Sequence, residues 1–316
     1  MTNLGIRQMK ASALFRILFL CFVIFSNVLF SDEKVLVFTY SYNRPDFIEI
    51  HHNTFKKFLK DEYEFIVFND ATDPSLYQQI HQTCQSLGIS CIDIPQELHI
   101  WNSPSARNGV VVDYSLRVLG YQHKGMVALF DSDLFLVKEF SIKEHMQEST
   151  LGGLYQHRQN GNDVIDYLWI GIVFLDMANL PNHDTIQFSP ISVRGVALDT
   201  GGLSHHYLAS HRNISVTYFN QFYNRKAFEL MQVPCNLCNS SQVPCEHAIQ
   251  RAKDYGKFDD NQIQYIIASG PNDAEFYIDS HFIHYRGGTN WDGLSEAHHK
   301  RKTQTFSDYI QTILQR

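Results

Sequence analysis

The chain has 316 residues, of which 44% are hydrophobic, 13% aromatic and 19% charged. This composition provides enough apolar material for a sizeable core, and the length suits one large α/β domain or two small ones. The formal net charge of -7 and the isoelectric point near 6.1 argue against non-specific nucleic-acid binding, which needs a basic surface. We therefore expect no nucleic-acid partner.

The amino terminus has the pattern of a targeting segment. Residues 1–16 form a short basic tail, and residues 17–31 are almost entirely apolar. The apolar run approaches the length of a membrane-spanning helix and lacks a clear cleavage site, which favours an uncleaved signal-anchor over a cleaved signal peptide. The positive-inside rule then predicts a single-pass membrane protein with an extracytoplasmic or lumenal body, residues 32–316; cleavage would instead give a secreted protein.

The first half of the body alternates short apolar runs with amphipathic segments. Strands are predicted at residues 35–40, 64–68, 91–94 and 125–130, and helices at residues 46–59, 74–87 and 105–119. Such alternation is typical of an α/β fold. We expect a mixed, mostly parallel central sheet flanked by helices.

The second half is less regular. Residues 167–175 read as an apolar strand, and residues 198–202 as a loop that leads into a helix. A capped helix is predicted from residue 258 to 267, and residues 277–284 read as a final short strand region. A polar helix closes the chain. No linker is visible, so we predict one domain with a first half at 32–140 and a second at 141–316.

The cysteines leave two interpretations open. One segment carries a set of potential zinc ligands, namely Cys235, Cys238, Cys245 and His247. Their spacing is not that of a standard zinc knuckle. In an extracytoplasmic body, disulfides within residues 235–245 and between Cys84 and Cys91 are at least as compatible with the sequence.

The most informative motif is Asp131-Ser132-Asp133, which lies between the apolar run 125–130 and a second one at 134–137. Residues i and i+2 of extended chain point to the same side, so both carboxylates can face one point beyond the strand. Such a pair suits a divalent cation that completes its shell with substrate phosphates and water. The alternative interpretation is a solvated acidic turn.

Taken together, these motifs resemble a GT-A type glycosyltransferase, a Rossmann-like nucleotide-sugar enzyme with an Asp-x-Asp metal site. The resemblance covers about residues 34–292. It implies that Asp131 and Asp133 bind the metal. It further implies that the residues contacting the nucleotide or the donor sugar are Thr39, Tyr40, Tyr42, Arg44, Asn69, Asp70, Arg107, Asn108 and Ser132.

The segment from His284 to Trp291 is similar to the His-x-x-Gly segment of the glycogenin-like branch. That resemblance implies a third metal ligand in His284 and a diphosphate-contacting loop with Arg286 and Gly287. The branch usually has Lys-Pro before the tryptophan. In this chain Thr289-Asn290 replaces Lys-Pro, so the lysine that would contact the phosphate is missing. Arg286 could supply that positive charge.

The expected reaction transfers a sugar from a UDP- or GDP-sugar to a glycan, protein or lipid acceptor. The leaving diphosphate needs charge neutralisation, which a cation supplies as Lewis acid and template. Two carboxylates with one imidazole favour Mn2+ somewhat over Mg2+. The candidate groups for contacting the acceptor hydroxyl are Asp199, Asp259 and Asp260. Asp259 and Asp260 also fit a simpler role as helix N-terminal charges.

Two other functions stay open at this stage. One is a metal-dependent hydrolase or nucleotidyltransferase that uses Asp131 and Asp133, although no histidine-rich motif flanks the pair. The other is a GT-A-like domain without catalysis that binds carbohydrate. The presence of both aspartates and His284 speaks against the latter.

Overall fold

The computed structural model describes residues 33–100, 103–161, 163–232, 246–270, 276–288 and 296–316. Val35–Arg316 forms one compact unit. The predicted tail and signal-anchor, residues 1–31, and the cysteines at 235, 238 and 245 lie outside the described residues, so these calls stay predictions. Within the described ranges, no helix is both long and apolar enough to cross a membrane.

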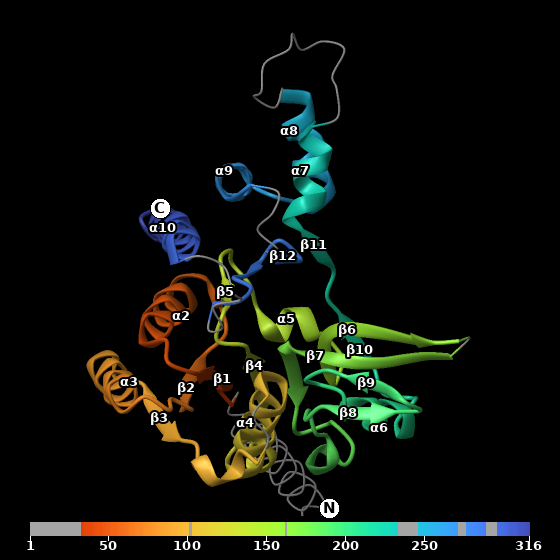
Figure 1. Ribbon diagram of the computed structural model, residues 1–316. Coiled ribbons are helices and arrows are strands. Elements are labelled where there is room, and N and C mark those ends of the chain that lie inside the picture. The colour runs from red at the N-terminus through yellow and green to blue at the C-terminus, as the bar shows by residue number, and fades with distance from the viewer. Residues whose placement is uncertain (1–32, 101–102, 162, 233–245, 271–275, 289–295) are drawn as a thin grey trace, which may run out of the picture. The chain divides into compact units, whose positions relative to one another are not determined.

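The central sheet has seven strands in the order β10-β6-β7-β4-β1-β2-β3 (Figure 1). Its strands are β1 (Val35–Ser41), β2 (Tyr63–Asn69), β3 (Ser90–Asp93), β4 (Met126–Phe130), β6 (Leu151–Asn160), β7 (Asp163–Asp176) and β10 (Val216–Tyr218). Only β7 runs antiparallel to its two neighbours, β4 and β6, whereas the other pairs are parallel. The predicted mixed, mostly parallel sheet is confirmed.

The described helices are α2 (Pro45–Phe58), α3 (Pro74–Leu87), α4 (Pro104–Val118), α5 (Ile142–Met146), α6 (Ser204–Ser210), α7 (Asn224–Gln232), α8 (Glu246–Gly256), α9 (Asp260–Ser269) and α10 (Glu296–Leu314). Helices α2, α3 and α4 cover the two faces of this sheet, whereas α7, α8 and α9 pack on one another and α7 also contacts β11. Alternate residues of β1 go to opposite faces: Val35 and Val37 pack with α2 and α3, whereas Phe38 and Tyr40 pack with α4. The helices predicted in the first half therefore lie where the sequence placed them.

A second, four-stranded sheet was not expected. It has the order β11-β12-β13-β5, with β5 (Leu134–Leu136), β11 (Gln221–Tyr223), β12 (Phe276–Ile278) and β13 (Phe282–His284). The single strand region predicted at residues 277–284 is therefore a hairpin whose turn holds Asp279 and Ser280 at positive φ. Because β5 directly follows the Asp-x-Asp turn and pairs with β13, this sheet places β13 beside that turn. A two-stranded sheet of β8 (Ile191–Val193) and β9 (Val196–Leu198) completes the strands.

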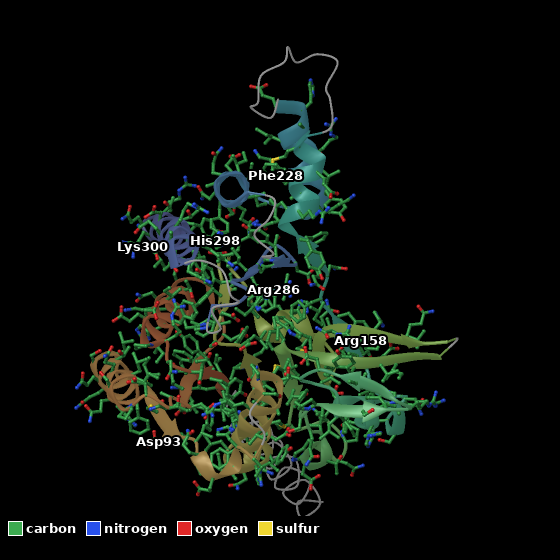
Figure 2. All side chains as sticks on the ribbon, viewed as in Figure 1. Asp93, Arg158, Phe228, Arg286, His298 and Lys300 are labelled. Atoms are coloured by element: carbon green, nitrogen blue, oxygen red, sulfur yellow. The ribbon has the colours of Figure 1, made fainter. Side chains whose placement is uncertain are left out.

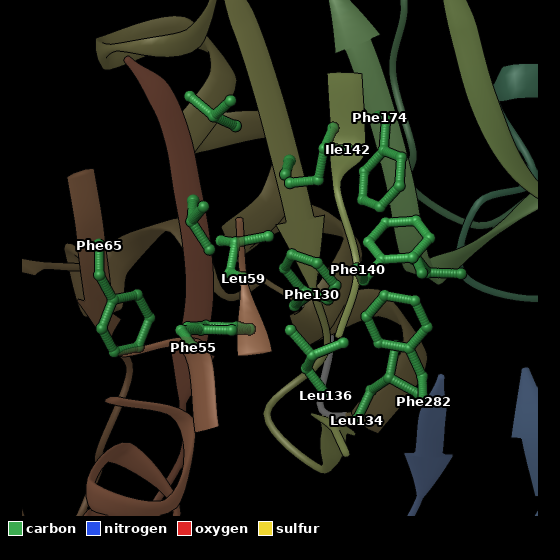
Figure 3. Packing of buried hydrophobic residues seen from close by; sticks show 14 of the residues in the cluster. Phe55, Leu59, Phe65, Phe130, Leu134, Leu136, Phe140, Ile142, Phe174 and Phe282 are labelled. Atoms are coloured by element: carbon green, nitrogen blue, oxygen red, sulfur yellow. The ribbon is translucent and has the colours of Figure 1, made fainter. Parts of the chain in front are cut away.

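A cluster of phenylalanines joins the two sheets (Figure 3). The ring of Phe282 on β13 lies 5.7 Å from that of Phe130 on β4 and 4.9 Å from that of Phe140. Phe174 on β7 lies 5.7 Å from Phe130. All four rings are almost fully buried, and deleting one such ring typically costs about 3–5 kcal/mol. The cluster thus fixes the end of β4 against β7 and β13.

Candidate functional site

The carboxyl ends of the parallel strands β1, β2 and β4 meet at one edge of the sheet. A cavity of about 410 Å³ opens there, at the place where open α/β sheets bind ligands. Most of the predicted site residues line it, namely Tyr40, Tyr42, Asp70, Arg107, Asn108, Asp131, Ser132, Asp133, Asp199, His284, Arg286 and Gly287. The edge of the sheet therefore gathers residues that the sequence places far apart.

Three of these residues form a carboxylate–imidazole cluster, which we define as Asp131, Asp133 and His284. One ligand atom of each lies within 4.8 Å of the others. The pairing of β13 with β5 produces this arrangement, because it places His284 opposite Leu134. The backbone N–H of Tyr285 also donates to the carbonyl of Asp133 over 2.7 Å. Two acids and an imidazole that are far apart in the sequence thus come together at one point.

In this buried cluster, each charged group strongly affects the pKa of its neighbours. Burial first, and the charge of Asp133 second, raise the pKa of the Asp131 carboxyl to about 7. Burial also acts to raise the pKa of Asp133, but the imidazole of His284, 3.2 Å away, and backbone N–H groups outweigh it, so that pKa lies below its ordinary value. A buried pair of acids that resists double ionisation is the kind of site that a divalent cation stabilises.

Backbone and amide groups hold the two carboxylates in place. Asp131 accepts from the N–H of Ser132 over 2.8 Å and from the side chain of Asn108. Asp133 accepts from the N–H of Gly288 over 3.2 Å. Arg44 donates to the carbonyl of the same glycine, so the loop after β13 is fixed from both sides.

A buried histidine lies behind the Asp-x-Asp turn. The Nε2 of His51 on α2 is 3.0 Å from the carbonyl of Ser132, so it carries the proton and donates. The ring packs 4.6 Å from Phe135. Burial lowers the pKa of His51 to about 4, so the ring stays neutral near pH 7 and ties the turn to α2.

The wall beside the turn comes from an irregularity in β7. Gly153 of β6 is opposite Val173, but its neighbour Leu154 is opposite Trp169, so residues 170–172 bulge from the ladder with β6, while Ile172 stays paired with Phe130 of β4. The carbonyl of Gly171 accepts from the N–H of Asp131 over 3.0 Å. A Cβ on Gly171 would lie 1.9 Å from the Trp169 indole, which therefore requires glycine there. Trp169 then lines the cavity, 5.1 Å from the His284 ring.

Another part of the cavity is built around an ion pair. Asp70 follows β2, and its carboxylate accepts from Arg107 Nε over 2.6 Å and from Arg107 Nη2 over 2.9 Å. His99 lies 2.7 Å from the same carboxylate. The guanidinium of Arg107 lies 5.0 Å from the centre of the Tyr42 ring. Arg107 is thereby fixed in orientation, with an aromatic face beside it.

Asp199 lies exposed on the wall that α4 shares with the segment after β9. It accepts from the hydroxyl of Ser105 and, over 2.8 Å, from the N–H of Thr200. Gly201 has a φ of +98°, and a Cβ there would lie 1.8 Å from the carbonyl of Leu168. Close approach of this glycine to β7 sets the position of Asp199.

The remaining predicted residues do not line the cavity. Thr39 and Asn69 are buried in the sheet, and the side-chain Oδ1 of Asn69 accepts from the N–H of Ala71. Asp259 caps α9 in a reciprocal capping box with Gln262, and Asp260 pairs with Lys253. Arg44 pairs with Asp46 and supports Gly288 as described above. All of these side chains except Thr39 have structural partners; among the described residues the buried Thr39 hydroxyl has no hydrogen-bond partner. The geometry favours the helix-end interpretation of Asp259.

The sequence pointed to no role for Ser103, Pro104, Ser105, Val111, Trp169, Ile170 or Thr200, which also line the cavity. The only signal was indirect: Gly171 interrupts an apolar run, and an isolated glycine in a strand indicates a bulge or a close approach. Residues 289–295, which include Trp291, lie outside the described residues. The diphosphate contact expected of this part of the loop stays a prediction.

No known sequence family matches this chain, and no curated protein sequence does. Among solved structures, glucosyl-3-phosphoglycerate synthase from Mycobacterium tuberculosis matches at 15% identity and a TM-score of 0.37, over 60% of this chain and 70% of that one. The glycosyltransferase GlyE of Streptococcus pneumoniae TIGR4 matches at 12% and 0.39, over 90% and 63%. An active-site mutant of LgtC matches at 12% and 0.42, over 87% and 96%. Because these TM-scores are below 0.5, the functional argument rests on the cavity itself.

Proposed function

We propose that this protein is a metal-dependent glycosyltransferase that moves a sugar from a nucleotide-sugar donor to an acceptor hydroxyl. The observation that carries the proposal is the carboxylate–imidazole cluster at the floor of a polar cavity beyond the strands. Its donor set fits Mn2+, or Mg2+, with positions left for diphosphate oxygens. When bound, the cation would act as a Lewis acid that neutralises charge on the leaving diphosphate.

The chain's own residues divide the rest of the work. Arg286 lines the cavity beside His284 and is exposed, so its guanidinium is available to a diphosphate. Figure 2 labels this side chain near the centre of the molecule. Tyr42 and the fixed Arg107 offer a ring face and directed N–H groups to the nucleoside or the donor sugar.

Asp199 is our candidate for contacting the acceptor hydroxyl. Its carboxylate is exposed at the cavity wall and is positioned by Ser105 and Thr200. In this position the group can accept a proton or a hydrogen bond from an incoming hydroxyl. Asp259 and Asp260 are not proposed for this role, because their partners lie on α8 and α9 away from the cavity lining.

A thermal-stability screen tests the proposed function. The full chain is heated with UDP, GDP and other nucleoside diphosphates, each with Mn2+, with Mg2+ and with EDTA. A ligand at 100 times its Kd adds about 2.7 kcal/mol to stability, which for a domain of this size raises Tm by about 5 °C. We expect this shift only for nucleotide plus cation, and a shift by free sugar alone would indicate a binding module instead.

Donor turnover provides the matched mutational test. Asp133→Ala should abolish cation-dependent hydrolysis of the responding nucleotide-sugar, whereas Asp184→Asn, an exposed acid outside the cavity, should leave it unchanged. Release of nucleoside monophosphate instead of diphosphate would identify a nucleotidyltransferase or hydrolase and reject the transferase. Unchanged turnover in Asp133→Ala would remove this cluster from the site.

A further inference from the structure

A second group of potential metal-ligating side chains lies at the lateral edge of the central sheet, beside β3. It occupies the contact between α3 and β3, the edge strand of the described sheet (Figure 1). Figure 2 labels Asp93 there, well apart from Arg286 in the cavity. None of the members of this group lines the cavity, so the proposed transferase chemistry does not use them.

Local backbone geometry brings three donors close together, with a fourth, Cys84, beside Cys91. His81 and Cys84 are three residues apart on α3, which places them on one helix face. Cys91 and Asp93 are two residues apart on β3, which places them on one face of the strand. One ligand atom each of His81, Cys91 and Asp93 lies within 4.8 Å of the others.

The fourth donor is the buried thiol of Cys84. Its side chain is hydrogen-bonded to that of Cys91, and both cysteines are free thiols. The structure therefore does not contain the disulfide that the sequence allowed between them. His81 Nε2 lies 2.8 Å from a carboxylate oxygen of Asp93. We call these four residues the thiol cluster.

We propose that His81, Cys84, Cys91 and Asp93 form a structural zinc-binding site. Two thiolates, one imidazole and one carboxylate are a soft, tetrahedral donor set that suits Zn2+ rather than Mg2+. Zinc–ligand lengths of about 2.0–2.3 Å separate tetrahedral donors by roughly 3.3–3.8 Å. Rotation of the His81 and Asp93 side chains, which are 38% and 47% exposed, would bring them to this spacing from Cys91. Cys84 would join them through its contact with Cys91.

Neighbouring side chains already orient one of the proposed ligands. The side chains of Tyr77 and Asn69 both hydrogen-bond the carboxylate of Asp93. Outer hydrogen bonds of this kind fix the orientation of metal ligands. Asn69 ends β2, so the carboxyl end of that strand supports the orientation of Asp93.

Cobalt substitution tests the site on the full chain. Reduced, metal-free protein carrying Cys235→Ser, Cys238→Ser and Cys245→Ser is titrated with Co2+, so that the other cysteine segment cannot contribute. We expect one equivalent to give the thiolate-to-cobalt charge-transfer band and the visible bands of a four-coordinate site. Zn2+ should displace the cobalt and abolish both bands.

Further variants assign the ligands. Cys91→Ser should abolish the charge-transfer band or weaken Co2+ binding at least tenfold, and His81→Gln should weaken it without unfolding, because His81 is partly exposed. Asp133→Asn should leave the band unchanged, since the carboxylate–imidazole cluster has no thiolate. The proposal is overturned if the triple-serine protein shows no band, if Cys91→Ser keeps it fully, or if the reduced pair reforms a disulfide in preference to binding Zn2+.

Discussion

The two clusters of potential metal ligands differ in how the chain assembles them. The carboxylate–imidazole cluster joins the end of β4 to β13, and it exists only when both sheets are formed. The thiol cluster comes from one helix and the next strand, α3 and β3. Distant assembly places hard oxygen donors in a polar cavity, where substrate can complete the shell. Local assembly places soft donors at a sheet edge, where the chain itself completes the shell.

The difference predicts independent responses to mutation. The largest effect should come from Asp133→Asn, which keeps the shape of the side chain but removes one charge from the buried cluster. Removing one partner from a buried group of charges costs about 3 kcal/mol. The affinity for nucleotide in the presence of Mn2+ should therefore fall about 150-fold. Isothermal calorimetry with UDP or GDP measures it. Co2+ binding at the thiol cluster should be unchanged, and a parallel loss there would refute the separation of the two sites.

A smaller effect is expected from His51→Phe. The phenyl ring fills the same buried space beside Phe135 but loses the hydrogen bond to the carbonyl of Ser132. Loss of such a supporting contact lowers metal affinity by about 10–100-fold, so we expect Mn2+-dependent nucleotide affinity to fall about 30-fold. His52→Phe, the adjacent residue, is the control. Equal effects of the two substitutions would show that the contact to the turn is unimportant.

Tyr77→Phe makes the corresponding change at the thiol cluster. In the native protein, the hydrogen bond from Tyr77 to Asp93 orients the carboxylate and raises the pKa of Tyr77 to about 12. The substitution removes this hydrogen bond. We expect Co2+ affinity there to fall about tenfold, measured by competition with a chelator. Tyr218→Phe, an exposed tyrosine on β10, should have no effect. A change in Mn2+-dependent nucleotide binding by Tyr77→Phe would contradict the independence of the sites.

The smallest effect concerns pH. Metal binding needs the Asp131 carboxylate, and its pKa of about 7 means that protons compete with the cation. Because the folded-state pKa is raised, the protonated form is favoured as pH falls, and cation affinity should drop about fourfold from pH 8 to pH 6.5. Nucleotide titrations at fixed Mn2+ measure this drop. An affinity that does not change between pH 8 and pH 6.5 would show that Asp131 is ionised throughout and that protons do not compete with the cation for it.

Much of the carboxylate–imidazole cluster could be predicted because its signal is local. The apolar run before Asp131 marks the end of a strand and places both acids at the edge of the sheet. The expected extended chain was wrong, because residues 132 and 133 form a turn in which the N–H of Leu134 donates to the carbonyl of Asp131. His284 required a resemblance, since nothing in the sequence pairs β13 with β5. Trp169 and Thr200 could not be predicted, because a bulge and the close approach of Gly201 to Leu168 place them.

Local helix rules also account for Asp259, whereas the thiol cluster depends on tertiary packing. Asp259 fitted both a helix cap and an acceptor contact, and the capping box with Gln262 shows that helix geometry uses it. The sequence paired Cys84 with Cys91 only as a possible disulfide, because they belong to different elements and their spacing matches no standard zinc motif. Only the packing of α3 on β3 brings His81 and Asp93 to the same point.

One measurement tests the central claim most directly. The full chain is titrated with UDP and with GDP by calorimetry, once with Mn2+ and once with EDTA. The account predicts that one nucleotide binds at least about 100-fold more tightly with the cation, and that Asp133→Asn abolishes the difference. Equal affinity in EDTA, or no binding of either nucleotide with Mn2+, would contradict a metal–diphosphate site at Asp131, Asp133 and His284.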